Sequence, residues 1–271
     1  MGQRYRYGFI GGGNMGEALI KGLIASGTAK PEEICFHDPD PGRQDRMRRD
    51  YQSALVENAA ESVKSAPVVI LAVKPQVMDN VLKEIAAAVT ADHLIISVAA
   101  GITLARLEAA WPAPVPVIRV MPNTPALVLA GAAALSPGSF ATPEHMKTAR
   151  SLFEAVGVAV ELEEKYMDVV TGLSGGGPAY IFVLLEALTD GAVRLGLPRP
   201  RARLLAAQTI MGAAKMALET GLHPAELKDQ VVSPGGTTAA GLHVLEKGGF
   251  RGLIMEAVAA ATARAGELGS K

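Results

Sequence analysis

The first 162 residues alternate short apolar runs with longer segments whose apolar positions recur at helical spacing. Residues 68–73 are the clearest run, because every side chain is apolar, as in a parallel strand buried on both faces. The expected strands are residues 7–10, 33–36, 54–57, 68–73, 94–98, 115–120, 132–135 and 159–162. Helices are expected from Met15, over 77–89, after Thr103 and over 144–156. This alternation predicts a doubly wound α/β domain over residues 1–162.

From residue 163 onward the pattern is helical, and no run is typical of a strand. The expected helices are residues 165–173, 178–195, 200–220, 224–231, 237–247 and 250–266. The helix over 178–195 is apolar nearly all round, so it must be buried on several sides. A region of about 110 residues offers limited burial. We therefore expect residues 163–271 to form an all-α domain whose helices pack against a second copy of the chain.

A glycine-rich turn connects the first strand to the first helix. Gly11, Gly13 and Gly16 stand in the spacing G-x-G-x-x-G. In that arrangement the first glycine permits the tight turn, the second lets a pyrophosphate approach the backbone, and the third allows close packing of helix on strand. The free N–H groups and the dipole of the helix start favour the negative charge of the phosphates. The N-terminal domain is therefore expected to be a Rossmann-type dinucleotide-binding domain.

The second strand ends at His37 and Asp38, about twenty residues beyond the glycine turn. A carboxylate there can accept hydrogen bonds from the adenosine ribose and repels a 2′-phosphate, which favours NAD over NADP. Arg43 and Arg46 follow on the next helix, and either could instead pair with a 2′-phosphate. A third reading is that Asp38 only caps a turn.

Composition and charge exclude several classes of function. The net charge is −1, so electrostatics give no reason to expect binding to nucleic acid or to an anionic membrane. The single cysteine, Cys35, lies in an apolar run and is expected in the core. No signal peptide is recognised and no apolar run is judged long enough to span a bilayer, so a cytoplasmic protein is expected. The five histidines show no metal-ligand spacing, so we expect no metal.

Two more glycine-rich stretches lie in the helical region, at residues 171–178 and 232–238. Both are expected to be loops that end at a helix N-terminus. Unpaired N–H groups and hydroxyls in such loops are a good receptor for a small carboxylate. Two of them behind a dinucleotide domain indicate an anionic substrate, although the glycines could instead serve only close helix crossings.

The helical region also bears on the reaction. No lysine lies between Lys165 and Lys215, where 3-hydroxyacid dehydrogenases carry a catalytic lysine after a glycine-rich loop. Oxidation of an alcohol, which needs a strong base, is therefore disfavoured. Reduction of a C=N bond needs less, because an imine is protonated near neutral pH and its nitrogen requires only a hydrogen-bond partner.

The sequence resembles the pyrroline-5-carboxylate reductases through nearly its whole length. The resemblance is carried by residues 9–16, 71–76, 119–125, 171–180, 223–229, 233–238 and 242–251. The loop Ser-Pro-Gly-Gly-Thr-Thr at 233–238 is the most specific of these. The resemblance implies NADPH- or NADH-dependent reduction of 1-pyrroline-5-carboxylate to L-proline, the last step of proline biosynthesis, by direct hydride transfer to the ring imine.

The resemblance also assigns roles to residues. It implies that the substrate carboxylate is held by Ser233, Gly235, Gly236, Thr237 and Thr238, and that the Thr238 hydroxyl, the catalytic group, faces the ring nitrogen. It implies cofactor contacts at Gly11, Gly12, Gly13, Asn14, Met15, Gly16, Asp38, Asn58, Ala72, Val73, Lys74, Pro75, Val98, Ala99 and Ala100. The nicotinamide is expected near residues 74–75 and 121–123. As partners it implies a second copy in an intertwined homodimer, with further assembly commonly to a decamer.

One position departs from the family pattern. Where the family usually has Ser-Gly-Ser-Gly-Pro, this chain has Gly176 in place of the second serine. Two rival functions remain at this point: reduction of another imine or of a 3-hydroxyacid, and a cofactor-binding scaffold without turnover. NADH and NADPH oxidation with pyrroline-5-carboxylate separates them.

Overall fold

The computed structural model describes residues 4–269, and the chain forms two compact units. The first extends to Gly176 and includes the chain again from Ala260 onward. The second is Gly177–Ala259. The last strand ends at Glu161, next to the boundary expected after residue 162. The helical turns that follow this strand still belong to the first unit, so the compact unit ends later than the change in pattern.

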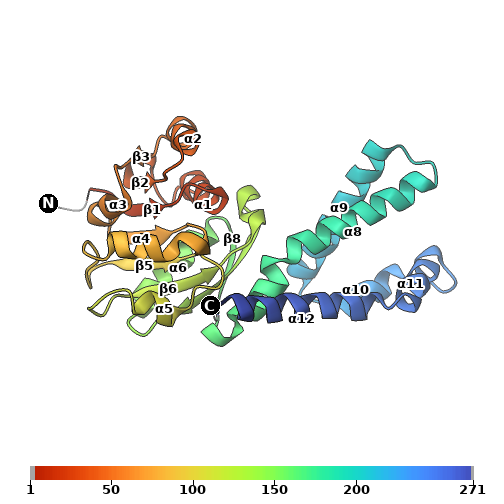
Figure 1. Ribbon diagram of the computed structural model, residues 1–271. Coiled ribbons are helices and arrows are strands. Elements are labelled where there is room, and N and C mark those ends of the chain that lie inside the picture. The colour runs from red at the N-terminus through yellow and green to blue at the C-terminus, as the bar shows by residue number, and fades with distance from the viewer. Residues whose placement is uncertain (1–3, 270–271) are drawn as a thin grey trace. The chain divides into compact units, whose positions relative to one another are not determined.

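An eight-stranded sheet forms the centre of the first unit, in the order β3-β2-β1-β4-β5-β6-β7-β8 (Figure 1). The strands are β1 (Tyr7–Ile10), β2 (Ile34–His37), β3 (Ala54–Leu55), β4 (Val68–Leu71), β5 (Leu94–Ser97), β6 (Val117–Met121), β7 (Gly131–Pro137) and β8 (Gly157–Glu161). All neighbours are parallel except β6 and β7. All eight expected strands are therefore present, with ends shifted by a few residues at most.

The helices of the first unit connect these strands. They are α1 (Asn14–Ala25), α2 (Pro41–Tyr51), α3 (Ala59–Ser65), α4 (Met78–Ile85), α5 (Leu104–Glu108), α6 (Pro143–Glu154) and α7 (Met167–Val170). Short 3₁₀ turns are η1 (Pro31–Glu33), η2 (Pro75–Val77), η3 (Thr124–Val128) and η4 (Glu164–Tyr166), and η5 (Thr171–Gly175) is a π-helix. The expected cap at Thr103 is confirmed, since its side chain accepts the Arg106 N–H at 3.2 Å. The helix expected over 77–89 is shorter, because it begins as the turn η2 and ends at Ile85.

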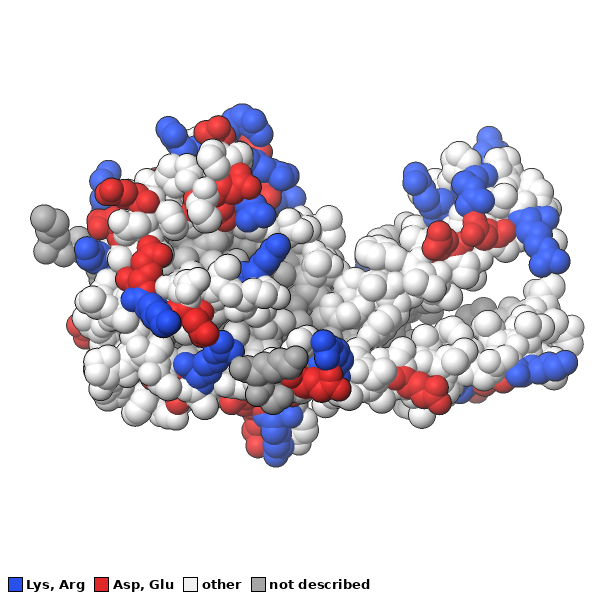
Figure 2. All heavy atoms as spheres, in the orientation of Figure 1, with Lys and Arg blue, Asp and Glu red and all other residues white. Residues whose placement is uncertain are grey.

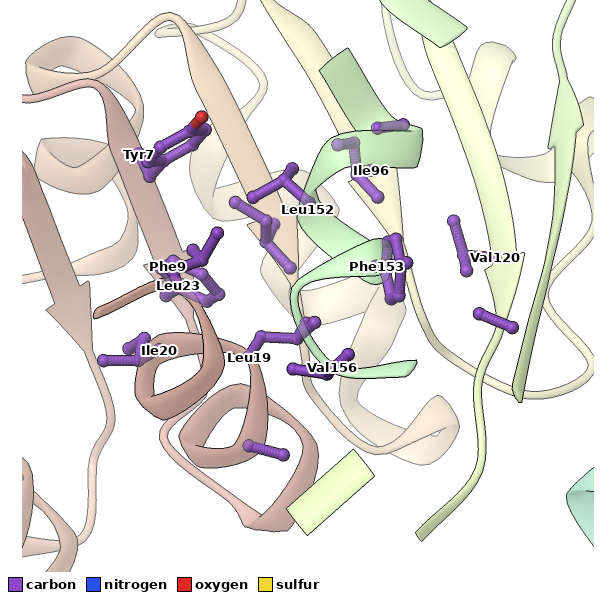
Figure 3. Close-up of a cluster of buried hydrophobic side chains, with 14 of the residues drawn as sticks. Tyr7, Phe9, Leu19, Ile20, Leu23, Ile96, Val120, Leu152, Phe153 and Val156 are labelled. Carbon is purple, nitrogen blue, oxygen red and sulfur yellow. The ribbon is translucent and has the colours of Figure 1, made fainter. Parts of the chain in front are cut away.

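Two apolar clusters cover the two faces of the sheet. Residues of α1, α2 and α6 pack on one face, and residues of α3, α4 and α5 on the other. Neighbouring strand residues point to opposite faces, as Phe9 and Ile10 do on β1. Figure 3 shows Phe9, Leu19, Leu23 and Phe153 gathered in the first cluster. Complete burial of such a side chain contributes roughly 1.5–3 kcal/mol, so the two clusters stabilise the sheet from both faces.

The second unit consists of helices, with no strand among the residues that the structure describes there. Its elements are α8 (Gly177–Arg194), α9 (Arg199–Thr220), α10 (Pro224–Val231), α11 (Thr237–Lys247) and the first half of α12 (Phe250–Gly269). These agree with the expected helices within a few residues. Many of their large apolar side chains are exposed, among them Phe182 at 63%, Leu204 at 69% and Leu218 at 81%. Figure 2 shows mostly uncharged surface along α8 and α12.

Candidate functional site

A cavity of about 630 Å³ lies at the carboxyl ends of β1 and β4. These strands are neighbours, and the Ala72 N–H donates to the Ile10 carbonyl at 2.8 Å just where both strands end. The order of the sheet reverses here, because β1 leads to β2 on one side while β4 leads to β5 on the other. Open α/β sheets bind their ligands at this switch point. The cavity is lined by Gly11, Gly13, Asn14, Met15, Asp38, Pro39, Arg43, Ala72, Val73, Lys74, Val77 and Val98.

The glycine turn has the backbone that a pyrophosphate requires. Gly11 has φ +104°, which L side chains rarely adopt, and a Cβ at Gly16 would overlap the Gly11 carbonyl. Gly13 is the N-cap of α1 and is open to the cavity: the nearest atom to a Cβ there would be Nη1 of Arg43, at 3.8 Å. The first N–H groups of α1 are thus available to an anion. The turn fits a dinucleotide.

Asp38 is almost fully buried and holds the glycine turn in place. Its Oδ2 accepts the Gly12 N–H at 2.7 Å, and its Oδ1 accepts the Asp40 N–H at 2.9 Å. The bond to Asp40 is the turn cap that the sequence left open as one alternative. The bond to Gly12 was not foreseen, since it depends on how closely the end of β2 approaches the glycine turn. Asp38 also lines the cavity, so its carboxylate is within reach of a bound dinucleotide.

Arg43 and Arg46, two of the four arginines of α2, differ in their surroundings. Arg43 lines the cavity, and its Nη1 lies 3.4 Å from Oδ2 of Asp38. Arg46 instead pairs with Glu17 at 3.1 Å, and Glu17 also accepts the hydroxyl of Tyr51 at 2.9 Å. Figure 2 shows charged residues of both signs over the part of the molecule where Figure 1 places α2.

Several expected cofactor residues do not line the cavity. Gly12 and Gly16 shape the turn from behind, as described above. Asn58 caps α3, where its side chain accepts the Glu61 N–H at 2.9 Å. Pro75 opens the turn η2, and Ala99 is buried. Ala100 also lies outside the lining, which includes Val98 from that segment. These positions remain predictions for the bound state.

The expected substrate loop lies in the second unit, at the N-terminus of α11. Gly236 is the N-cap of this helix and donates its N–H to the Ser233 carbonyl at 3.0 Å, closing a tight turn. A Cβ at Gly236 would overlap the Ser233 side chain. Ser233, Gly235 and Thr237 are exposed, while Thr238 is half-buried in the first turn of α11. The loop therefore presents hydroxyls beside the N–H groups that open the helix.

Comparison with known proteins extends this picture over the whole chain. Residues 164–268 match a family model described as pyrroline-5-carboxylate reductase dimerisation, and residues 6–101 match one described as NADP oxidoreductase, coenzyme F420-dependent. A pyrroline-5-carboxylate reductase of Methanosarcina acetivorans is 47% identical over 270 residues, covering 99% of this chain and 100% of the relative. That of Escherichia coli is 44% identical and covers 93% of this chain and 94% of the relative.

The chain belongs to the pyrroline-5-carboxylate reductase family.

Solved structures agree with this assignment. The pyrroline-5-carboxylate reductase of Coxiella burnetii has a TM-score of 0.91 and 38% identity, and covers 98% of each chain. The pyrroline carboxylate reductase of Plasmodium falciparum, solved with NADP bound, has a TM-score of 0.88 and 32% identity, and covers 98% of this chain and 99% of that chain. The family assignment makes the chain an NAD(P)-dependent oxidoreductase, and the match to a dimerisation model assigns self-association to its helical region.

The expectation that residues 171–178 form a loop is wrong, since most of this glycine-rich stretch is helical, while a role in binding the substrate carboxylate stays a prediction. Residues Thr171–Gly175 form a π-helix, Gly176 is a bend, and α8 begins at Gly177. The Gly176 N–H donates to the Thr171 carbonyl at 2.9 Å and so caps the π-helix. A Cβ at Gly175 would lie 2.5 Å from Cε of Met121, so this stretch packs closely against the end of β6.

Asn123 connects this π-helix to the sheet through contacts that the sequence did not predict. Its Nδ2 donates to the Ser174 carbonyl at 3.1 Å, and its Oδ1 accepts the Ala132 N–H at 2.8 Å. Both bonds run to backbone groups, which explains why an asparagine follows the proline at this strand end. Its side chain thus positions the segment that follows β6.

One expectation about membranes needs correction. The continuous helical stretch Glu164–Arg194 has 31 residues and an 18-residue window with a mean hydropathy of 1.3, so by length and composition it could cross a membrane. Only 11% of that window is buried within the chain. The expected apolar run began at Ile181, and it left out the apolar residues that precede Ile181 in the same helical stretch. This stretch lies within the region that matches the family's dimerisation model, so a second copy of the chain, instead of a membrane, can bury its apolar side chains.

Proposed function

We propose that this protein reduces 1-pyrroline-5-carboxylate to L-proline with NADPH or NADH, as the last step of proline biosynthesis in the cytoplasm. The observation that carries the proposal is the loop at residues 233–238, in a chain related along its length to reductases of that name. The substrate is a small cyclic imine with one carboxylate. A helix N-terminus flanked by hydroxyls matches the charge of that carboxylate.

In this proposal the loop binds and orients the substrate. The N–H groups at the start of α11 and the hydroxyls of Ser233 and Thr237 hold the carboxylate. The Thr238 hydroxyl oxygen accepts a hydrogen bond from the ring N–H, since the ring nitrogen carries a proton in the reactive iminium. Bound NAD(P)H supplies a hydride to the imine carbon, so the C=N bond becomes CH–NH. The contribution of the protein is position and charge complementarity.

The residues that hold the cofactor in this proposal are those around the cavity of the first unit. The N–H groups of Gly13 and of the first turn of α1 hold the pyrophosphate, and Asp38 faces the adenosine ribose. Ala72, Val73, Lys74 and Val98 form the opposite wall. The remaining contacts, at Asn58, Pro75, Ala99 and Ala100, are proposed for the bound state by family resemblance.

We further propose that the helical units form an intertwined homodimer, which can assemble further to a decamer. The large exposed apolar side chains of α8, α9 and α12 support this assembly, because a monomer would leave them in water. Such a partner also covers the apolar helical stretch Glu164–Arg194, so no membrane is invoked.

The test is oxidation of NADPH and of NADH on addition of 1-pyrroline-5-carboxylate, with Thr238→Ala compared to Thr238→Ser. We expect Thr238→Ala to lower kcat/KM by about 10²-fold, a loss typical of one transition-state hydrogen bond, while NADPH affinity stays unchanged. Thr238→Ser keeps the hydroxyl and should retain most activity. Equal kinetics for the two variants would refute the role of the hydroxyl.

The parent protein separates the rival functions. Tight cofactor binding without oxidation of the cofactor would identify a scaffold. Turnover of a 3-hydroxyacid with NAD⁺ but not of the pyrroline would identify the other reductase class.

A further inference from the structure

Asp38 and Arg43 place opposite charges side by side in the wall of the dinucleotide cavity. Asp38 is 2% exposed, and both of its carboxylate oxygens accept backbone N–H groups, from Gly12 and Asp40. The backbone carbonyl of Asp38 also accepts Nε2 of Gln44 at 2.7 Å. The position of the carboxylate is therefore fixed by the chain itself. The bonds that hold the glycine turn are thus made within the chain.

Arg43 is held much less tightly. Its only described ionic contact is with Oδ2 of Asp38 at 3.4 Å, which is long for a charge-assisted bond, and its side chain is 48% exposed. It lies beside the open face of Gly13 and lines the same cavity. The guanidinium can thus turn toward a ligand while its backbone stays fixed in α2.

Arg46, three residues further along α2, does not have this freedom. Its Nε contacts Glu17 at 3.1 Å and Asp50 at 3.9 Å, and it is not among the residues that line the cavity. Of the two arginines that the sequence suggested for a 2′-phosphate, Arg43 and Arg46, the structure therefore singles out Arg43. Arg46 serves as a matched control, because it has the same chemistry on the same helix.

We propose that Arg43 allows this chain to use NADPH as well as NADH, by neutralising Asp38 and binding the 2′-phosphate of the adenosine. This inference rests on the cofactor class in the proposed function. A carboxylate alone at this place would repel a 2′-phosphate, whereas a guanidinium binds phosphate through paired N–H groups. Unphosphorylated ribose needs only the carboxylate, which has about four acceptor sites; two accept backbone N–H groups and a third makes the long contact with Arg43.

The inference gives Asp38 and Arg43 separate tasks. Asp38 fixes the glycine turn and serves both cofactors, while Arg43 matters for NADPH alone. Arg43 is thus a specificity-determining residue, and its removal should convert an enzyme of dual use into one that prefers NADH.

The experiment measures binding without substrate, so that it does not depend on turnover. NADPH, NADH and adenosine 2′,5′-bisphosphate are titrated into the parent, Arg43→Ala, Arg43→Lys and Arg46→Ala, following nicotinamide fluorescence for the first two and calorimetry for the third. We expect Arg43→Ala to weaken NADPH and the bisphosphate by about tenfold or more, since one charge-assisted contact is worth at least that factor. NADH should change by less than about twofold. The NADPH affinity of Arg43→Lys should lie between those of the parent and Arg43→Ala, and the affinities of Arg46→Ala should match those of the parent.

An equal loss of NADH and NADPH affinity in Arg43→Ala would overturn the inference, because it would indicate a general role in the turn. Unchanged binding of the bisphosphate would overturn it as well. Thermal unfolding of Arg43→Ala should match that of the parent, as expected for a half-exposed side chain. If the parent protein failed to reduce the pyrroline but Arg43→Ala still lost affinity for NADPH and not for NADH, the proposed substrate would be rejected and this inference would stand.

Discussion

At the scale of single residues, Cys35 illustrates how burial suppresses reactivity. The thiol lies on β2 with no exposure to solvent, as the apolar run around it predicted. Loss of solvation raises the pKa of Cys35 to about 12 from a usual value of 9.0. The thiol is thus protonated at neutral pH and is a core side chain rather than a nucleophile.

This pKa shift predicts a loss of stability at alkaline pH. The folded state keeps the Cys35 proton to about pH 12, whereas the unfolded chain releases it near pH 9. The contribution of the protonated Cys35 thiol to the free energy of unfolding is therefore complete below pH 9. It decreases as the pH rises toward 12, by about 1.4 kcal/mol per pH unit. Denaturant unfolding of the parent and of Cys35→Ala between pH 8 and pH 11 checks this. The free-energy difference between them should narrow as pH rises, and a constant difference would contradict the shift.

Asp38 marks the limit of prediction for single residues of the site. The glycine motif and the position of Asp38 at the end of the second strand predicted a carboxylate in the cofactor site, and in the structure Asp38 lines the cavity beside the glycine turn. They could not reveal that Gly12 donates to it, because that bond depends on the spacing of two segments that are 26 residues apart. The same holds for the difference between Arg43 and Arg46, which arises from Glu17 on another helix.

At the scale of elements, Asn123 joins η5 to β7 through two backbone hydrogen bonds. π-helical turns are rare and occur often at functional sites. Here the close packing of Gly175 on Met121 and the bond from Asn123 support the turn.

Replacing Asn123 should therefore destabilise the protein. Asn123→Ala leaves the Ala132 N–H and the Ser174 carbonyl without these partners, which should cost about 1–3 kcal/mol. Differential scanning calorimetry should record a lower Tm than that of the parent. Asn80→Ala, an exposed asparagine on α4, is the control and should leave Tm unchanged or slightly raised. A Tm equal to the parent's in Asn123→Ala would mean that these bonds carry no net stability.

Hydrophobic periodicity predicted which elements exist, because burial on two faces demands continuous apolar strands such as β4. It did not reveal that β7 runs antiparallel to β6, since pairing direction depends on the path of the connection. Nor did it reveal the π-helix: glycines at 172 and 175–177 suggested a loop, but packing against Met121 keeps this stretch helical. Local pattern thus predicted the elements, and their irregular parts were set by tertiary contacts.

At the scale of the whole molecule, the exposed apolar side chains predict an obligate assembly. Phe182 on α8 is 63% exposed within the chain, and Val183 beside it is 67% exposed. Phe182→Glu should place a charge in the covered surface and convert dimers or larger species to monomers, as measured by sedimentation at micromolar concentration. Val128→Glu is the matched control, because Val128 is 73% exposed on η3 in the other unit, and it should assemble as the parent does. An unchanged sedimentation coefficient for Phe182→Glu would place the interface elsewhere.

The division of the chain into units has a consequence for folding during synthesis. The first unit takes in the end of α12 as well as the sheet, and Ala265 on that segment is buried. The backbone there also approaches the loop after β5, where Gly101 and Gly269 lie in contact. Domains generally complete in order as a ribosome releases them. Here the dinucleotide unit begins first and is completed only after the whole helical unit has emerged, so a nascent chain that stalls before Ala260 has every residue of the glycine turn and an unfinished domain around it.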